Sequence, residues 1–243
     1  MTYCVGLLLD EGLVFLSDSR TNAGVDNIST FRKTTVFEAK GDRVLVLLTA
    51  GNLAVTQSVV SLLKERVGAA EPALTLYSAP NMYEAARCVG DAIRQIHDRD
   101  AAPLKEHGIE FAATFILGGQ IGSERPRLFQ LYAAGNFIEA TRETPYFQIG
   151  ESKYGKPIID RIVRPETSLR DGAKCALISM DSTIRSNLSV GPPLDLTIYR
   201  RDALRADARL QIGAEDDYFK MVRSDWSDAL RQAFRALPDP PWG

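Results

Sequence analysis

Two predicted β-hairpins at the start of the chain constrain its fold more than any other feature. Each has two short apolar runs, and the four predicted strands cover residues 3–9, 13–17, 34–39 and 44–49. Residues 10–12 (DEG) separate the first pair and residues 40–43 (KGDR) the second, which is typical of tight turns between antiparallel strands. Polar, turn-rich residues 20–32 lie between the hairpins, so four strands are expected before the first helix.

After the hairpins, the apolar residues recur at helical spacing. The clearest stretch starts at Met82 and continues with apolar residues 3, 4, 7, 10, 11 and 14 positions later, which predicts a helix. Further helices are predicted over 53–67, 154–163, 168–180 and 216–236, and further strands over 111–117, 128–133, 146–149, 194–199 and 210–212. Ser168 followed by Asp171 is a weak capping box, and Gly118-Gly119 is a predicted turn.

The order of these elements predicts the layers of the fold. Strands of a hairpin pair antiparallel, and helices grouped between sheet regions must cover sheet faces. We therefore predict one α+β domain over residues 1–243, a four-layer αββα sandwich of two stacked antiparallel sheets flanked by helices. A two-layer α+β fold is the alternative. Residues 237–243 (LPDPPWG) are expected to form a stiff, exposed tail.

Composition argues against several classes of function. The chain carries 29 Lys and Arg against 31 Asp and Glu, so it has no positive excess for binding nucleic acid or an anionic membrane. Cys4, Cys88 and Cys175 are far apart and, with only His97 and His107, show no metal-ligand spacing. We expect no metal and no cofactor. Without a signal peptide or an apolar run long enough to span a bilayer, the sequence predicts a cytoplasmic protein.

Thr2 is the most informative candidate for chemistry because of its position. It lies directly before the first predicted strand, so removal of Met1 would leave a threonine at the end of a sheet. The α-amine of such a threonine can accept the proton of its own hydroxyl, so the nucleophile requires no histidine. A free α-amine has a pKa of roughly 7.7–8.0 and is mostly protonated at neutral pH. A nearby lysine ammonium lowers that pKa, and a carboxylate keeps the lysine charged.

Asp18 and Lys33 are the candidates for this charge pair. Asp18 ends the second predicted strand and Lys33 starts the third, so both are expected beside the first strand, beneath Thr2. Taken alone, each has an ordinary interpretation, Asp18 as a turn or capping residue and Lys33 as a solvated lysine. Gly51, alone, is an ordinary turn glycine.

Six segments, taken together, resemble one family. They are MTYCVGL at 1–7, LSDSRTNAGVDN at 16–27, FRK at 31–33, TAGN at 49–52, GESKYGKPI at 150–158 and MDSTIRSNLSVGPP at 180–193. With this set the chain resembles the proteasome β-subunit superfamily of N-terminal nucleophile hydrolases, and within it the bacterial proteasome-like peptidases of the Anbu family. The resemblance covers essentially the whole chain.

The resemblance implies a role for each matching position. Thr2 would act as nucleophile and base, Asp18 and Lys33 as its charge pair, and the backbone amide of Gly51 as the oxyanion donor. A glycine between a strand and a helix allows close approach of a substrate and directs amides at developing negative charge.

Two supporting positions depart from the family pattern. The family places a serine beside the threonine amine within G-S-G, where residues 150–152 of this chain read G-E-S, so either Glu151 occupies that place or Ser152 substitutes. Glu151 equally suits a carboxylate at the start of a helix. The family's distal D-x-x-S pair corresponds to residues 186–189 (SNLS) of this chain, which retain Ser189 but lack the aspartate.

The leading hypothesis is a threonine peptidase that cleaves amide bonds through an ester on Thr2. Two alternatives stay open: a non-catalytic subunit that builds a ring, and an amidase for small molecules with the same chemistry. The resemblance also implies a homo-oligomer, a ring or an open helical ring, that admits peptides or unfolded chains. The sequence has no G-x-x-x-x-G-K-[ST] motif, so any ATPase partner would be a separate protein.

Overall fold

The computed structural model describes residues 1–22, 28–66 and 74–242, which form strands and helices in alternating groups. The strands are β1 (Tyr3–Leu9), β2 (Gly12–Asp18), β3 (Arg20–Asn22), β4 (Ile28–Thr30), β5 (Thr34–Ala39), β6 (Arg43–Gly51), β7 (Ala113–Ile121), β8 (Arg127–Leu131), β9 (Phe137–Glu139), β10 (Tyr146–Gly150), β11 (Leu194–Arg200) and β12 (Ala208–Ile212). The helices are α1 (Leu53–Glu65), α2 (Met82–Glu106), α3 (Ser152–Ile162), α4 (Leu169–Ser186) and α5 (Asp217–Ala236).

Most of the strands belong to two antiparallel sheets of five strands each. The first sheet has the order β10-β1-β2-β11-β12, and the second has the order β5-β6-β7-β8-β9. The small ribbon of β3 and β4 stands apart from both. The two predicted hairpins are present as β1–β2 and β5–β6, and each belongs to a different sheet.

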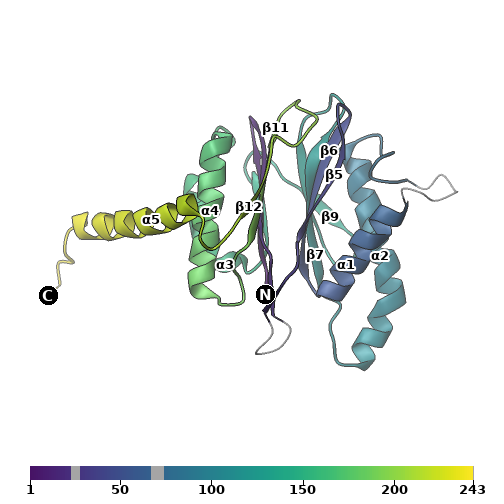
Figure 1. Cartoon of the computed structure of the whole chain (residues 1–243), viewed down its shortest axis with the longest axis horizontal. Coiled ribbons are helices and arrows are strands. Elements are labelled where there is room, and N and C mark those ends of the chain that lie inside the picture. The colour runs from purple at the N-terminus through teal and green to yellow at the C-terminus, as the bar shows by residue number, and fades with distance from the viewer. Residues whose placement is uncertain (23–27, 67–73, 243) are drawn as a thin grey trace.

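Three apolar clusters separate four layers. Side chains such as Phe15, Val46 and Ile116 fill the space between the two sheets. α1 and α2 pack behind the second sheet on a cluster that includes Leu47, and α3 and α4 pack behind the first sheet on a cluster that includes Leu7. Figure 1 shows the resulting order of helices, sheet, sheet and helices. The predicted αββα sandwich is confirmed, and the two-layer alternative is wrong.

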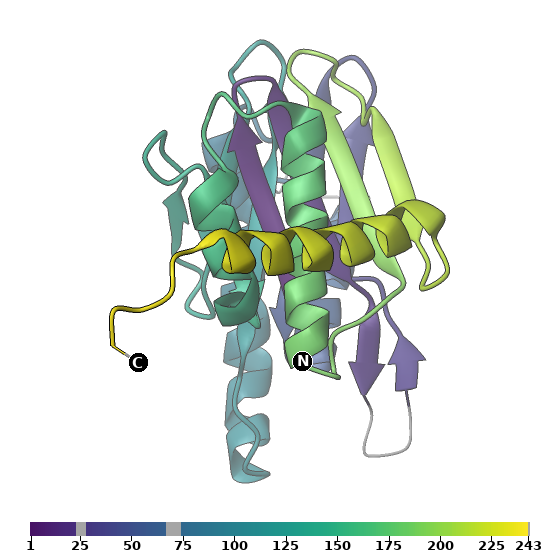
Figure 2. The ribbon, with the colours of Figure 1, turned by 90° about the vertical axis from the view of Figure 1, so that its left-hand side faces the viewer.

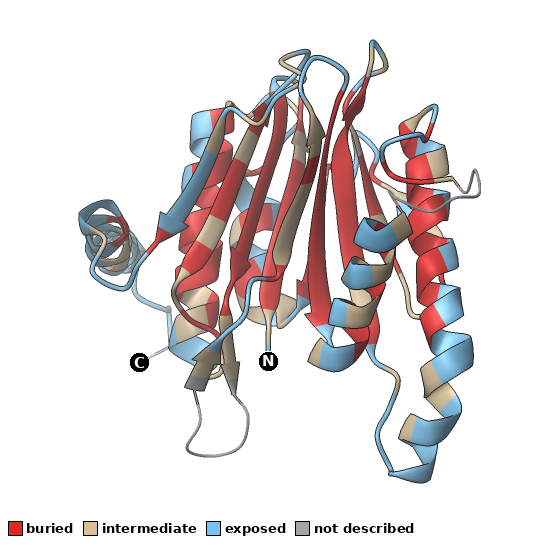
Figure 3. Ribbon diagram, turned by 45° about the vertical axis from the view of Figure 1, so that its right-hand side comes forward, coloured by how far each residue is buried: buried red, intermediate tan, exposed pale blue. Residues whose placement is uncertain are grey.

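The central strands are buried on both faces because each sheet packs against helices on one face and against the other sheet on the opposite face. Figure 3 shows this burial along β1, β2 and β6, which explains why their sequences are continuous apolar runs rather than alternating ones. The last helix is different. α5 crosses the outer side of α4 (Figure 2), and Phe219 and Val222 are its buried residues.

One glycine pair that was predicted to form a turn lies inside a strand. Gly118 and Gly119 belong to β7, which continues to Ile121. A Cβ atom on Gly118 would come within 2.7 Å of the Phe15 ring, and one on Gly119 within 2.0 Å of the Val44 carbonyl oxygen. These glycines permit close contact between the sheets and between neighbouring strands, so the predicted turn is wrong.

The polar segment before Lys33 also differs from the prediction. Its ends pair as β3 and β4, so among the described residues six strands rather than four precede α1. These strands are short and polar, so they carry no apolar pattern that could have revealed them. Residues 23–27, in the middle of the predicted turn region, lie outside the described residues.

Capping explains where helices begin. The Ser168 side chain accepts a hydrogen bond from the Asp171 amide at the start of α4, as predicted, and Asn52 caps α1 in the same way. The predicted helix end at Val67 and the last tail residue, Gly243, lie outside the described residues. Among the helices described, none has the length and apolar character needed to cross a membrane.

Candidate active site

The start of the chain is held at one end of the first sheet, where β1 meets β10. Tyr3 pairs with Gly150, and the Glu151 amide donates a hydrogen bond to the Thr2 carbonyl oxygen at 2.7 Å. Gly150 has a φ of +80°, and a Cβ atom there would lie 2.0 Å from the same carbonyl oxygen. Glycine at this position therefore allows the end of β10 to contact the backbone of Thr2.

A buried ion pair lies beside this end of β1. Asp18 is the last residue of β2, and Lys33 directly precedes β5. The Lys33 ammonium donates to Asp18 Oδ1 at 2.8 Å and to the Arg20 carbonyl oxygen at 2.7 Å. The Lys33 side chain is 5% exposed and the Asp18 side chain is fully buried, so the pair is largely shielded from water.

Two backbone amides also bind the Asp18 carboxylate. Tyr3 donates to Oδ1 at 3.0 Å and Gly191 donates to Oδ2 at 3.4 Å. Burial raises the pKa of the Asp18 carboxyl, and the Lys33 ammonium and these two amides oppose that rise. One carboxylate thus joins β1, the residue before β5 and the segment that follows α4.

The segment between α4 and β11 closes the far side of this ion pair. Beside the Gly191 contact, the Ser19 amide and hydroxyl both donate to the Pro193 carbonyl oxygen, at 3.0 and 2.5 Å. Ser189 lies two residues before Gly191, and its amide donates to the Asn187 side chain at 2.9 Å. The structure therefore places Ser189 on the segment that contacts the buried carboxylate.

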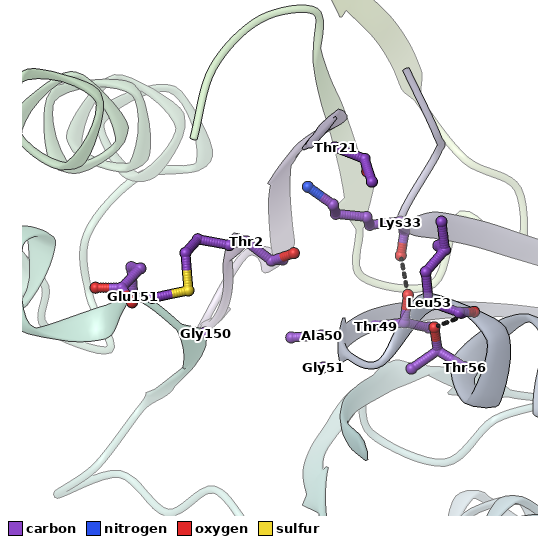
Figure 4. A pocket seen from close by; sticks show the side chains of 11 residues that line it. Thr2, Thr21, Lys33, Thr49, Ala50, Gly51, Leu53, Thr56, Gly150 and Glu151 are labelled. Carbon is purple, nitrogen blue, oxygen red and sulfur yellow. Dashed lines mark hydrogen bonds between the residues drawn. The ribbon is translucent and has the colours of Figure 1, made fainter. Parts of the chain in front are cut away.

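Gly51 lies at the junction between β6 and α1. Its φ is +117°, and a Cβ atom there would lie 2.3 Å from the Ala112 carbonyl oxygen, so the junction requires glycine. Asn52 Oδ1 then accepts from the Ala54 amide at 3.0 Å, in the first turn of the helix. In Figure 4, Gly51 lies on the opposite side of Thr2 from Glu151.

One pocket of about 520 Å³ brings most of the predicted site residues together. It is lined by Met1, Thr2, Thr21, Lys33, Thr49, Ala50, Gly51, Leu53, Thr56, Gly150 and Glu151. Figure 4 shows the amino group of Lys33 directed towards the part of the pocket where Thr2 lies. The arrangement offers a hydroxyl group, a fixed ammonium group and a strand-to-helix turn to one substrate.

The structure separates the two candidates for the place beside the threonine amine. Glu151 lines the pocket, and its carboxylate lies 3.6 Å from the Lys153 ammonium and makes no capping hydrogen bond. Ser152 is the first residue of α3, and it is not among the described residues that line the pocket. Glu151 is therefore the candidate that the pocket geometry favours.

Several groups that shape the site were missed from the sequence. Arg20 contributes its carbonyl oxygen and Gly191 its amide, so no side-chain pattern marks them. Thr21 and Thr49 add side chains to the pocket. Thr21 lies within the segment at 16–27 and Thr49 within the segment at 49–52, and this membership was the available signal.

The Tyr3 side chain is a further missed contact. Its buried hydroxyl lies 2.6 Å from Ser179 Oγ and accepts a hydrogen bond from the Gln148 amide, while Ser179 donates to the Gly155 carbonyl oxygen at 3.0 Å. Burial raises the pKa of the Tyr3 hydroxyl, so it stays neutral. Tyr3 therefore anchors the strand that carries Thr2 to α3 and α4.

The three cysteines lie in the core. Cys4, Cys88 and Cys175 are free and buried, and burial raises the pKa of each thiol, which disfavours the reactive thiolate. Within the described ranges, no group of three or more His, Cys, Asp or Glu side chains is arranged to hold a metal ion.

The sequence is similar to that of proteasome subunits. It is 25% identical over 210 residues to "Proteasome subunit beta 2" of Pyrobaculum calidifontis, which covers 86% of this chain and 94% of the relative. No family model matches the chain.

Solved structures show a stronger similarity over nearly the whole length. An Anbu (Gly-1) mutant from Hyphomicrobium sp. strain MC1 is 53% identical, with a TM-score of 0.92 and 99% of both chains covered. Anbu from Pseudomonas aeruginosa, described as a helical assembly of the Anbu complex, is 46% identical with a TM-score of 0.92, covering 99% of this chain and 98% of that one. The resemblance predicted from the six sequence segments is confirmed.

Proposed function

This chain belongs to the Anbu family of proteasome-like proteins, and from that premise we propose that it is a threonine peptidase that uses Thr2 after Met1 has been removed. One observation carries the proposal: a buried, fixed Lys33 ammonium lines the same pocket as Thr2. This charge is what would convert the amine of Thr2 into a base.

The effect on the amine follows from electrostatics. Asp18 and the Arg20 carbonyl oxygen hold the Lys33 ammonium in place, and because its side chain is only 5% exposed, its charge is weakly screened. A neighbouring positive charge disfavours protonation of an α-amine, whose pKa then falls below the usual range of roughly 7.7–8.0. The amine of Thr2 would be largely neutral at neutral pH and able to accept a proton.

The proposed reaction has two steps. In the first, the α-amine takes the Thr2 hydroxyl proton, Oγ1 bonds to the substrate carbonyl carbon, and the C–N bond breaks as the leaving amine receives that proton. In the second, a water molecule gives a proton to the same α-amine and attacks the ester. The acid leaves, and the hydroxyl of Thr2 is restored with the proton held by the amine.

The remaining residues have supporting roles in this proposal. The Gly51 amide would donate a hydrogen bond to the oxyanion; loss of one such donor in a serine protease costs about 2.7–4 kcal/mol. Asp18 would hold Lys33, and Glu151 would take the place beside the amine. Ser189 would act through the segment whose Gly191 amide binds the Asp18 carboxylate.

We also propose that the protein works in the cytoplasm as a homo-oligomer, either a ring or an open helical ring. The helical assembly described for the Pseudomonas aeruginosa relative supports this. Such an assembly would enclose the pocket and admit peptides or unfolded chains, and a separate ATPase would be needed to unfold a folded substrate.

The test is the intact mass of the purified protein before and after exposure to a peptide epoxyketone. The hydroxyl of Thr2 adds to the ketone and its amine opens the epoxide, so the whole probe mass is retained and both groups are tested together. We expect a chain without Met1 that carries one adduct per subunit. Thr2→Ala should keep the fold and take up no probe.

Each other outcome contradicts the proposal in its own way. A chain that keeps Met1 has no free threonine amine and would favour a non-catalytic assembly subunit. Adducts on Thr2→Ala would place the reaction elsewhere. Turnover of small amides with no labelling by peptide probes would favour the amidase alternative.

A further inference from the structure

The candidate active site is divided between the two sheets. Thr2 directly precedes β1, and Asp18 ends β2 of the same first sheet. Lys33 directly precedes β5 and Gly51 ends β6, and these two strands belong to the second sheet. Figure 1 shows the two sheets as separate layers. The distance between the Thr2 hydroxyl and the Gly51 amide therefore depends on how closely the sheets approach each other at this end of the fold.

The space between the sheets is filled mainly by apolar side chains, such as Phe15, Val46 and Ile116. Apolar packing is non-directional, whereas a hydrogen bond holds its two groups within a narrow range of distance and angle. Hydrogen bonds that cross from one sheet to the other are therefore the contacts best suited to fix the spacing locally.

Two pairs of neutral side chains form such crossing hydrogen bonds among the described residues. The hydroxyl groups of Ser17 (β2) and Thr34 (β5) lie 2.8 Å apart. The hydroxyl of Tyr199 (β11) donates to Gln120 Oε1 (β7) at 2.7 Å. The two pairs lie at opposite ends of β2, because Tyr199 pairs with Leu13 near its start, whereas Ser17 is next to its last residue.

The Ser17–Thr34 pair lies beside the candidate site. Ser17 directly precedes Asp18, and Thr34 pairs with Leu48 of β6, three residues before Gly51. Ser17 is fully buried, and it is not among the described residues that line the pocket. Its hydroxyl group therefore joins the sheet that carries Thr2 to the strands that carry Gly51, without lining the space that a substrate would occupy.

The Lys33 ammonium depends less on this spacing than Gly51 does. It donates to Asp18, at the end of β2, and to the carbonyl oxygen of Arg20, two residues later. The four-carbon side chain of Lys33 can absorb a small movement of its own backbone. The Gly51 amide has no such freedom, because it is part of the backbone of β6. A change in spacing should therefore move the Gly51 amide relative to Thr2 and leave the ammonium in place.

We propose that Ser17 is a positioning residue, which through its hydrogen bond to Thr34 sets the distance between the Thr2 hydroxyl and the Gly51 amide. The inference rests on the proposed peptidase function and adds to it a residue that does not touch the substrate. A donor to an oxyanion acts when it lies about 2.7–3.1 Å from the position that the oxyanion takes, so small displacements of the donor weaken it. Loss of the Ser17 hydroxyl should slow the chemical step and leave the binding of a probe unchanged.

Ser17→Ala in the full-length protein, exposed to the peptide epoxyketone, tests this. The Thr2 hydroxyl gives its proton to the α-amine and bonds to the ketone carbon, which creates an oxyanion at the proposed Gly51 donor. We expect the labelling rate at saturating probe to fall roughly tenfold, since a misplacement of about 1 Å can cost about a hundredfold. The half-saturating probe concentration and the pH midpoint of labelling should match the wild type, because Lys33 and Glu151 still line the pocket.

Tyr199→Phe is the matched control, because it removes the crossing hydrogen bond at the other end of the sandwich. Each variant loses one hydrogen bond between the sheets, so both melting temperatures should fall by about 2–4 °C. Only Ser17→Ala should slow the labelling of Thr2.

Variants of Thr34 test the partner of Ser17. If Ser17 acts through this hydrogen bond, Ser17→Ala should have little further effect on the labelling rate in a Thr34→Val background. Thr34→Ser keeps the hydroxyl group and should retain most of the wild-type rate.

The positioning role and the proposed function fail in different ways. A wild-type labelling rate in Ser17→Ala, or an equal loss of rate in Tyr199→Phe, would overturn the positioning role while labelling of the wild type still supported the peptidase. A full tenfold loss from Ser17→Ala in the Thr34→Val background would also overturn it. A wild-type protein that takes up no probe would overturn the proposed function, and the positioning role with it.

Discussion

Asp18 and Asp181 are both buried carboxylates paired with cations, but their partners differ in access to water. Lys33, the partner of Asp18, is 5% exposed. Asp181, in α4, accepts from Arg185 at 2.9 Å and from Arg223 of α5 at 2.6 Å, and these partners are 52% and 34% exposed. The cations of the second region are therefore far more exposed to solvent than the cation of the first.

This difference determines what each pair can do. Exposed cations are screened by water and salt, so such pairs are worth about 0–1 kcal/mol and act over short range. A cation without water around it interacts more strongly and over a longer distance. In the proposed function the Asp18 region lowers the pKa of the neighbouring Thr2 amine, whereas the Asp181 region attaches a largely exposed helix to the body of the fold.

Removing Lys33 should have the largest effect in either region. Lys33→Met leaves the Asp18 carboxylate buried without its counter-ion, and we expect the free energy of unfolding to fall by about 3–5 kcal/mol at neutral pH. Labelling of Thr2 should fall at least about a hundredfold, because the amine stays protonated. Urea unfolding and the intact-mass assay measure the two effects.

The pH dependence of this variant identifies the cause. Lys33 opposes the rise in the pKa of Asp18 that burial produces, so in Lys33→Met that pKa rises further. A group whose pKa is higher in the folded state contributes stability at low pH and loses it as the pH rises through the folded pKa. The stability gap to the wild type should therefore narrow towards acidic pH.

A double variant provides the control for Lys33→Met. Adding Asp18→Asn removes the unpaired charge and should recover part of the stability without recovering Thr2 labelling. A double variant as unstable as Lys33→Met would show that the buried charge is not what destabilises the protein.

The second prediction concerns the backbone contact that holds Thr2 near this pair. Gly150→Ala should lower the free energy of unfolding by about 2–4 kcal/mol, through a strained φ and a clash with the Thr2 carbonyl oxygen, and should slow labelling of Thr2. Gly41 has nearly the same φ, +81°, and nothing within 4 Å of an added Cβ atom. Gly41→Ala should therefore cost only about 1–2 kcal/mol and leave labelling unchanged. If Gly150→Ala and Gly41→Ala lowered the free energy of unfolding equally, the backbone at Thr2 would be able to move away from the added Cβ atom at little cost.

Much of the fold could be predicted because its layers follow from local patterns. Helical spacing and the capping box at Ser168 predict α2 and α4, and the two hairpins predict which strands pair. The prediction of a turn at Gly118 and Gly119 was wrong because a glycine pair is typical of a turn. Only the packing against Phe15 shows why this pair lies within β7.

Less of the candidate site than of the fold could be predicted from the sequence. The hairpins predict that Asp18 ends one strand and that Lys33 directly precedes another. The contact between the two residues depends on how the two sheets stack, because the hairpins belong to different sheets. The roles of the Gly191 amide and the Arg20 carbonyl oxygen could not be predicted. Backbone groups are alike in almost every residue, so the amino-acid sequence does not reveal which of them meet across distant segments.

The smallest effect is expected in the Asp181 region. Arg223→Met removes one of two partners and leaves Asp181 bonded to Arg185 in the same helix, so the free energy of unfolding should fall by about 1 kcal/mol or less. The amides of α5 should exchange hydrogen faster, because this ion pair joins α5 to α4. Labelling of Thr2 should match the wild type, since this pair lies outside the pocket.

Salt sharpens the contrast between the two regions. Raising the ionic strength should speed hydrogen exchange in α5 of the wild type, because Arg223 is 34% exposed. It should change the Lys33→Met stability gap much less, because Lys33 is only 5% exposed. If Arg223→Met instead reduced Thr2 labelling as strongly as Lys33→Met, access of water to the partner cation would not separate the two carboxylates. The Asp18–Lys33 pair would then affect the labelling of Thr2 no more than the Asp181–Arg223 pair does.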